Sequence, residues 1–295
     1  MNNLNKITAV IVLYNTTELI FKCLDKIQGI KIIIVDNGKN EKRIIDLIKN
    51  NYNIFKYFKL KKNIGFGRAC NFALKYVHTE YTLLIEPDVL IEKSSLENLI
   101  LTLEKYPDSG MATPRFVDEN YNVIDFLGDF QENGKGVARN ELEENLNSKL
   151  SKTFAEGDIC INFCLAAILL LNNKIIKKTG LFNKKIFLYW EDFELCRRLK
   201  IQKISIIKSF NSTAVHLERR SVRSSYFNKF IMTVHNDKSA YIYFNVKKNN
   251  PIFIKRFFLY IFRFISYLLI LNLKKSLKNL ARVYAIYLYL KNEKN

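Results

Sequence analysis

Apolar runs and amphipathic stretches alternate along the first third of the chain. The runs 7–13, 31–35 and 55–60 are rich in β-branched or aromatic residues and too short for helices of their own, so we predict three strands. Between them, apolar residues at 19–27 and 41–51 follow the helical period. This alternation predicts an α/β fold with a mainly parallel, Rossmann-like sheet flanked by helices. Ligands of such folds bind at the carboxyl ends of the strands.

Polar residues stand where these strands are expected to end. Tyr14 and Asn15 follow the first strand, and Asp36 follows the second. After the third, residues 62–71 (KNIGFGRACN) form a turn with two glycines, which resembles a dinucleotide fingerprint but lacks its third glycine and does not follow the first strand. A glycine turn that leads into a helix is suited to binding a phosphate or ribose through backbone amides; a simple turn is the alternative.

The apolar strand from Tyr81 runs directly into Glu86, Pro87 and Asp88. One rigid turn can aim both carboxylates at a hard cation. Mg²⁺ and Mn²⁺ are usually held by one or two carboxylates together with substrate phosphates. The alternative is a turn with solvated acidic side chains.

A second acidic pair, Glu191 and Asp192, follows the aromatic run 187–190 (FLYW) at the expected start of a helix. Exposed amides and the helix dipole favour an ionised carboxylate in a first turn, and an ionised carboxylate beside a pocket is a competent base. The alternative is that Asp192 is only an N-cap and Trp190 only a core aromatic residue. Two separate acidic sites suit a reaction that needs a base on one side and neutralisation of the charge on a departing group on the other.

The order of these segments resembles glycosyltransferase family 2, and within it the bacterial rhamnosyltransferase-like branch. The resemblance covers about residues 5–225 and depends on segments 12–15, 35–38, 63–67 with Asn71, 86–89, 180–183 and 187–192. It implies the GT-A fold, a nucleotide-diphosphate sugar donor (dTDP-rhamnose or UDP-hexose type), inversion at the anomeric carbon and a divalent metal ion, Mg²⁺ or Mn²⁺.

The resemblance also implies roles for single residues. Asp192 would be the general base with Glu191 beside it, Asp88 would bind the metal ion, and Trp190 would lie on the acceptor side. The donor would be bound by Tyr14, Asn15, Asp36, Asn63, Gly65, Asn71, Glu86 and His216. Tyr14 and Asp36 would contact the nucleotide base. His216 would bind phosphate together with Arg219 and Arg220; the alternative is that His216 has only a structural role.

Two positions depart from the family pattern. Glu86 stands where Asn or Asp is common, which makes Asp88 the firmer metal ligand of the two. Leu165 stands where a glycine often precedes the alanine of the acceptor-side strand, so the identity of the donor sugar does not carry over. Between the two acidic pairs, residues 115–154 suit a mobile loop over the acceptor or, equally, a variable surface insertion.

Charge is concentrated at the C-terminal end. Residues 201–295 hold 18 Lys and Arg and 3 Asp and Glu, which accounts for +15 of the total charge of +19. We therefore divide the chain into a catalytic domain, 1–225, and a helical, basic, amphipathic extension, 226–295. The longest uncharged run of this extension, 264–273, is too short for the ~20 residues of a spanning helix.

If residues 251–290 form one helix, five basic residues share one face: Arg256, Arg263, Lys274, Lys278 and Arg282. Apolar residues fill the other face, so we expect an interfacial helix on an anionic membrane surface. Packing against the protein's own core is the alternative. Nucleic acid is not expected as a partner, because no known binding motif is present.

Cysteine usage and the first residues indicate the compartment. The five cysteines form no CxxC pair, and the first residues lead into a predicted strand without a signal-peptide pattern, which favours a cytoplasmic enzyme peripheral on the inner face of the membrane. We expect transfer of one sugar to a lipid-linked glycan in surface polysaccharide (O-antigen or capsule) assembly. A non-catalytic adaptor that binds a membrane or a nucleic acid is the alternative.

Overall fold

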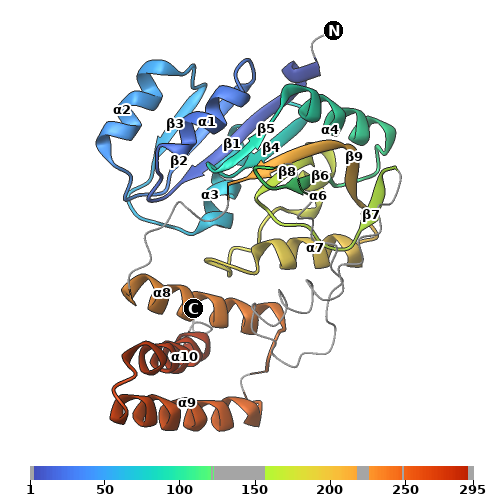
Figure 1. The fold of residues 1–295 in the computed structure, drawn as a ribbon. Coiled ribbons are helices and arrows are strands. Elements are labelled where there is room, and N and C mark those ends of the chain that lie inside the picture. The colour runs from blue at the N-terminus through green and yellow to red at the C-terminus, as the bar shows by residue number, and fades with distance from the viewer. Residues whose placement is uncertain (1–2, 121, 123–156, 218–225, 248, 292–295) are drawn as a thin grey trace.

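The computed structural model describes residues 3–120, 122, 157–217, 226–247 and 249–291. Most of the predicted acceptor loop (115–154) lies outside these residues, as do Arg219 and Arg220. The described chain forms a sheet domain with helices on both faces and a helical layer beneath it (Figure 1).

One sheet of nine strands forms the centre of the described structure, in the order β3-β2-β1-β4-β8-β6-β9-β5, with β7 paired to β9. Strands β1 to β4 pair in parallel, whereas β8 runs antiparallel to both β4 and β6. The strand bounds are β1 Ile7–Leu13, β2 Lys31–Asp36, β3 Lys56–Lys59, β4 Tyr81–Ile85, β5 Val89–Ile91, β6 Met111–Val117, β7 Ile159–Ile161, β8 Ile168–Asn172 and β9 Ile206–His216.

Apolar layers on both faces of the sheet explain why the central strands β1, β2, β4 and β8 are largely hydrophobic along their length. Successive side chains of a strand point to opposite faces, so Ile11 of β1 belongs to one core cluster and Val12 to the other. The first cluster is covered by α1 (Leu19–Lys26), α2 (Lys42–Asn51) and α4 (Lys93–Lys105). The second is covered by α3 (Phe66–Ala73), α6 (Asn173–Thr179) and α7 (Glu191–Ile201).

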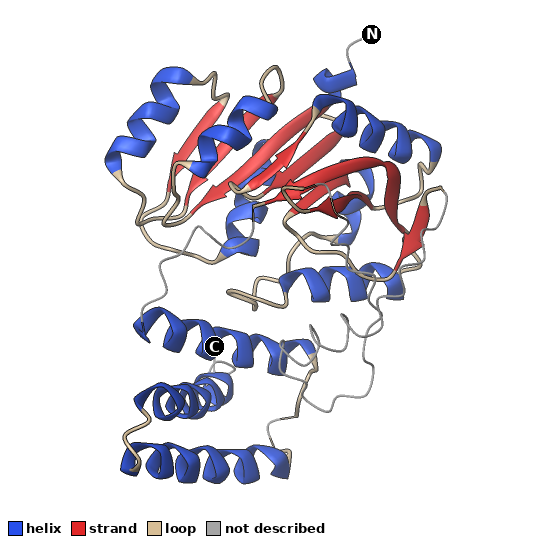
Figure 2. Ribbon diagram, in the orientation of Figure 1, coloured by secondary structure: helices blue, strands red, loops and turns tan. Residues whose placement is uncertain are grey.

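The C-terminal extension contains three helices, α8 (Tyr226–Tyr243), α9 (Pro251–Leu269) and α10 (Leu273–Lys291) (Figure 2). The prediction of one helix over 251–290 is therefore wrong. Leu271 adopts a left-handed backbone conformation (φ 55°), and the Asn272 side chain accepts a hydrogen bond from the Lys275 amide at 3.2 Å. An αL residue ends one helix and an Asn cap begins the next, so the chain turns back on itself.

The predicted single basic face is wrong for the same reason. Arg282 of α10 turns inward, with its Nε 3.7 Å from Asp237 Oδ2 of α8 and its guanidinium over the Tyr260 ring of α9. None of the described helices combines the length and the hydropathy needed to span a bilayer.

Candidate active site

The acidic turn between β4 and β5 lies against the end of β9. Strand β5 pairs antiparallel with β9 so that Val89 is opposite His216. This register places His216 Nε2 3.7 Å from Asp88 Oδ1 and 3.8 Å from Glu86 Oε2. One ligand atom from each of the three residues lies within 4.8 Å of the others, a spacing that suits a shared metal ion.

Backbone hydrogen bonds fix this turn on both sides. The Leu217 amide donates to the Asp88 carbonyl at 3.0 Å, and the Glu86 amide donates to the Ala167 carbonyl at 2.8 Å. The Asp88 side chain is only 6% exposed, whereas that of Glu86 is 38% exposed. Asp88 is thus the better shielded of the two carboxylates, and Glu86 lies at the solvent side of the cluster.

The predicted base-binding residues lie in an ordered loop at the ends of β1 and β2. The buried carboxylate of Asp36 accepts hydrogen bonds from the Gly38 amide (3.0 Å), from Asn40 Nδ2 (2.6 Å) and from the Tyr57 hydroxyl (2.7 Å). Burial and this contact with Asp36 raise the pKa of Tyr57, so its proton stays on the hydroxyl. Tyr14 and Asn15 are half-buried at the start of the adjoining loop.

The glycine turn joins this loop to the aromatic run. The Asn63 carboxamide oxygen accepts hydrogen bonds from Asn37 Nδ2 (2.9 Å) and from the Gly65 amide (2.8 Å). Gly65 has φ +89°, and a Cβ there would overlap the carbonyl oxygen of Phe187 and lie 2.9 Å from its carbonyl carbon. Glycine is therefore required both for the conformation and for the close approach of residues 187–190.

Asn71 has a structural contact here. Its Nδ2 donates to the Phe182 carbonyl at 2.8 Å, and its Oδ1 accepts from the Phe182 amide at 3.1 Å. The side chain therefore holds α3 against the segment that leads to the acidic pair. Its contact with a donor stays a prediction.

The acidic pair begins α7 after an unusual backbone. Tyr189 and Trp190 both have positive φ angles, 63° and 67°. Bulky residues in this region cost about 1–3 kcal/mol each and persist only where their surroundings hold them. Trp190 is the N-cap residue of α7, so Glu191 and Asp192 are its first two residues, half-buried in the first turn. The interpretation of Asp192 as only an N-cap is therefore wrong.

Two observations place the acidic turn and the acidic pair near each other. Burial and, after it, the charges of Glu191 and Glu86 raise the pKa of the Cys70 thiol on α3, so both carboxylates act on one buried group. Residues 163–167 connect the two places as well. The carbonyl of Ala167 accepts the Glu86 amide, and Phe163 stacks on Phe193 of α7 with 4.1 Å between ring centroids.

Trp190 is a packing residue in this structure. Its ring is 3% exposed and lies between Tyr243 and Phe244 of the C-terminal extension and Phe193 of α7. Its Nε1 donates to Asn236 Oδ1 on α8 at 3.2 Å. The burial agrees with the core-aromatic alternative, and the acceptor-side contact stays a prediction.

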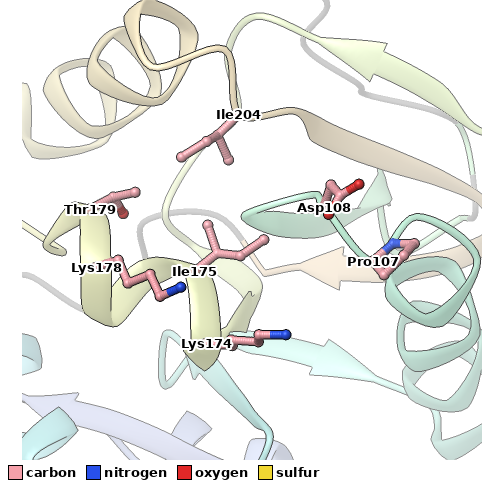
Figure 3. A pocket seen from close by; sticks show the side chains of 7 residues that line it. All are labelled: Pro107, Asp108, Lys174, Ile175, Lys178, Thr179 and Ile204. Atoms are coloured by element: carbon pink, nitrogen blue, oxygen red, sulfur yellow. The ribbon is translucent and has the colours of Figure 1, made fainter.

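A pocket elsewhere on the molecule contains none of these residues (Figure 3). It lies between the turn before β6 and helix α6 and is lined by Pro107, Asp108, Lys174, Ile175, Lys178, Thr179 and Ile204. Because it lies away from the carboxyl ends of β1, β2 and β4, we assign it no part in the candidate site.

Comparison with known proteins supplies the family. The model of glycosyl transferase family 2 matches residues 8–155, just over half of the 295-residue chain. The chain belongs to glycosyltransferase family 2.

Curated relatives of this family member match at low identity. The rhamnosyltransferase WbbL of Escherichia coli (strain K12) is 25% identical over 182 residues, which cover 56% of the chain and 66% of that protein. The teichoic acid poly(glycerol phosphate) polymerase of Staphylococcus epidermidis is 28% identical over 170 residues, 52% of the chain and 21% of that protein. The matched part thus spans less than two thirds of either relative.

Solved structures of similar shape show the fold. GalNAc-T7 with UDP, GalNAc and Mn²⁺ superposes with a TM-score of 0.62 at 12% identity, covering 99% of this chain and 57% of that one. The mannosyltransferase PcManGT of Pyrobaculum calidifontis, with GDP-Man and Mn²⁺, gives 0.54 at 14% identity, covering 96% and 72%. The prediction of a GT-A fold with a helical C-terminal extension is confirmed.

Proposed function

We propose that this family member transfers a single sugar, with inversion, from a nucleotide-diphosphate sugar to a hydroxyl of a lipid-linked glycan in bacterial surface polysaccharide assembly. The observation that carries the proposal is the cluster of Glu86, Asp88 and His216 at the carboxyl end of β4. A dTDP-rhamnose donor is in keeping with the rhamnosyltransferase relative, and a UDP-sugar donor with a neighbour, TarS of S. aureus, that was solved with UDP-GlcNAc.

The cluster fits a divalent cation. Two carboxylates and one imidazole form a donor set that accepts Mn²⁺ or Mg²⁺, and each of these ions leaves coordination positions for phosphate oxygens. When bound, the ion would neutralise charge that develops on the departing nucleotide diphosphate. Asp88 would be the main ligand because it is the most deeply buried of the three, and Glu86 and His216 would complete the protein's share.

The chain's other residues divide the remaining work. Asp36 and Tyr14 would hold the nucleotide base, and the turn at Asn63 and Gly65 would present backbone amides to the ribose or phosphates. Asp192 would accept the proton of the acceptor hydroxyl. The oxygen of that hydroxyl would attack the anomeric carbon on the face opposite the leaving group. A positioned base typically contributes 10²–10⁴-fold to such a step.

A thermal-shift and turnover screen tests the proposal. At a concentration 100 times its Kd, a nucleotide-diphosphate sugar with Mn²⁺ should add about 2.7 kcal/mol to the free energy of unfolding, which raises Tm by several degrees. We expect such a shift for one class among dTDP-rhamnose, UDP-hexoses and UDP-N-acetylhexosamines, followed by slow hydrolysis of that donor. A chain that neither shifts with any donor nor hydrolyses one would instead fit a non-catalytic adaptor.

The exposed face of α9 supports a membrane partner. Five apolar side chains at helical spacing form a stripe that is 49–78% exposed: Ile254, Phe258, Phe262, Ile265 and Leu269. Residues 251–291 hold eight Lys and Arg and no Asp or Glu. Six of these basic residues are exposed, whereas Arg256 and Arg282 are partly buried near Asp237. An exposed apolar stripe on such a segment fits an anionic leaflet, where each basic residue near the surface contributes about 1 kcal/mol. We therefore propose that the protein binds the inner face of the membrane through α9.

Flotation with liposomes tests this placement. Because each buried Phe contributes about 1.5–3 kcal/mol, Phe258→Ser with Phe262→Ser should lower partitioning by roughly tenfold or more on vesicles that contain phosphatidylglycerol. Leu101→Ser on α4 removes a side chain of similar exposure (51%) and is the matched control. Equal flotation of the double variant and the control would contradict the membrane face. Concentration-dependent self-association without flotation would point to a second copy of the chain as the occupant.

A further inference from the structure

The C-terminal half of helix α8, from His235 to Tyr243, contacts residues 187–190. Its Asn236 accepts the indole N–H of Trp190 at 3.2 Å, and its Ser239 hydroxyl donates to the carbonyl of Leu188 at 2.9 Å. The His235 ring stacks on Phe187 with 4.3 Å between centroids. Three of the four residues of the aromatic run thus have a partner on this helix.

A further contact reaches past the acidic pair. Nη1 of Arg197, one turn and a half along α7, donates to the carbonyl of Tyr243 at the end of α8 at 3.0 Å. Tyr189 packs into the same apolar cluster as Trp190 and Tyr243. Helix α8 therefore contacts the chain on both sides of Asp192.

The opposite face of α8 packs against α9 and α10. Val234 packs on Ala281 and Ala285 of α10, and Asp237 pairs with Arg282 at 3.7 Å. Tyr241 meets Phe253 of α9 at a centroid distance of 5.0 Å. Positions 234, 237 and 241 share one side of a helix of 3.6 residues per turn, and positions 235, 236, 239 and 243 share the other.

We infer that α8 is a positioning element for the catalytic loop, and that Asn236 and Ser239 hold residues 187–190 in the backbone conformation that aims Asp192. The left-handed pair Tyr189 and Trp190 needs such support, because bulky residues leave this conformation when their surroundings loosen. Helix α8, which packs against α9 and α10, would therefore also hold the proposed base, Asp192, in position. This role of α8 rests on the proposed function only where turnover is measured. The fluorescence of Trp190 tests it without that function.

The His235 ring is suited to this packing. Burial, and after it the charge of Lys238, lower the pKa of His235 to about 4, so the ring is neutral at neutral pH. A neutral ring stacks on Phe187 without a desolvated charge.

The only tryptophan of the chain is Trp190, so its fluorescence reports on the loop without any substrate. In Asn236→Leu and Ser239→Ala, acrylamide quenching of this fluorescence should increase. The matched control is Thr233→Ala, which removes a hydroxyl of the same helix that donates only to the Lys229 carbonyl. Asn236→Gln keeps a carboxamide, whose oxygen can accept the indole N–H and whose amino group can donate to Asp237, and should keep the quenching low.

Turnover supplies the second readout. A small displacement of a catalytic group costs up to 10²-fold, so we expect kcat to fall roughly tenfold to a hundredfold in Asn236→Leu while the Kd for the nucleotide diphosphate with Mn²⁺ changes little. Asn236→Gln should retain most of the kcat. If folded Asn236→Leu shows the same quenching and the same kcat as the wild type, the inference is overturned. It is also overturned if the Thr233→Ala control shows as large an increase in quenching as Asn236→Leu. If no variant or wild-type protein transfers sugar but the quenching differs as expected, the proposed function fails and the positioning role stands.

Discussion

Asp192→Asn should lower turnover by 10²–10⁴-fold while binding of the donor persists. The amide has the size of the carboxylate, and its oxygen can still accept the hydrogen bond that the Phe193 amide donates to Asp192 Oδ1 at 2.9 Å. The start of α7 should therefore keep its conformation. What the substitution removes is the ability to take a proton from the acceptor hydroxyl.

The measurement is single-turnover transfer together with the Tm shift produced by the nucleotide diphosphate and Mn²⁺. Glu191→Gln is the informative comparison, since it makes the same change one residue earlier. Glu97→Gln on the exposed side of α4 controls for the loss of one negative charge. Turnover near the wild-type level in Asp192→Asn, with a severe loss in Glu191→Gln, would exchange the roles of the two carboxylates.

Asp88→Asn should abolish the dependence of donor binding on metal. The metal supplies several kcal/mol of leaving-group stabilisation, so we expect turnover to fall by about 10²-fold or more. Asp88 and Glu86 belong to one cluster, and removing one of two neighbouring carboxylates relieves repulsion in the metal-free chain. The Tm of the metal-free variant should therefore equal or exceed that of the wild type.

Mn²⁺ titration with and without nucleotide diphosphate, followed by Tm, measures this effect. His216→Ala should weaken the metal response less than Asp88→Asn, because both carboxylates stay in place. Glu92→Gln removes an exposed carboxylate that pairs with Lys26 at 2.5 Å, close to β5, and should leave the metal response unchanged. A full Mn²⁺ response in Asp88→Asn would remove this residue from the metal site.

Local pattern was a good guide to the parallel half of the sheet. Strand β1 has the predicted bounds, β2 is one residue longer at its C-terminal end, and β3 is one residue shorter at each end. Strands β1 and β2 are buried on both faces, so their hydrophobic runs are uninterrupted and their ends are marked by polar residues. The signal is weaker around residues 159–172, where the apolar residues belong to two short strands, β7 and β8, that pair with different partners.

The C-terminal helices show a second limit. Asn272 is a typical N-cap residue and could have indicated the break between α9 and α10. The long apolar pattern concealed it, because both helices of a hairpin share the same period. The Arg282 side chain turns inward because it pairs with Asp237, which is 45 positions away in the sequence. A local sequence pattern cannot predict such a contact.

By itself, the sequence determined the alternation of strands and helices, the polar residues at the strand ends and the two acidic pairs, because each of these depends on neighbours a few positions apart. The tertiary structure alone decided that His216 joins Glu86 and Asp88, since that depends on the register of β5 on β9. It also decided that Trp190 packs against α8 and that Gly65 lies under Phe187. These contacts join residues that are far apart along the chain, and only the packed fold specifies which of them meet.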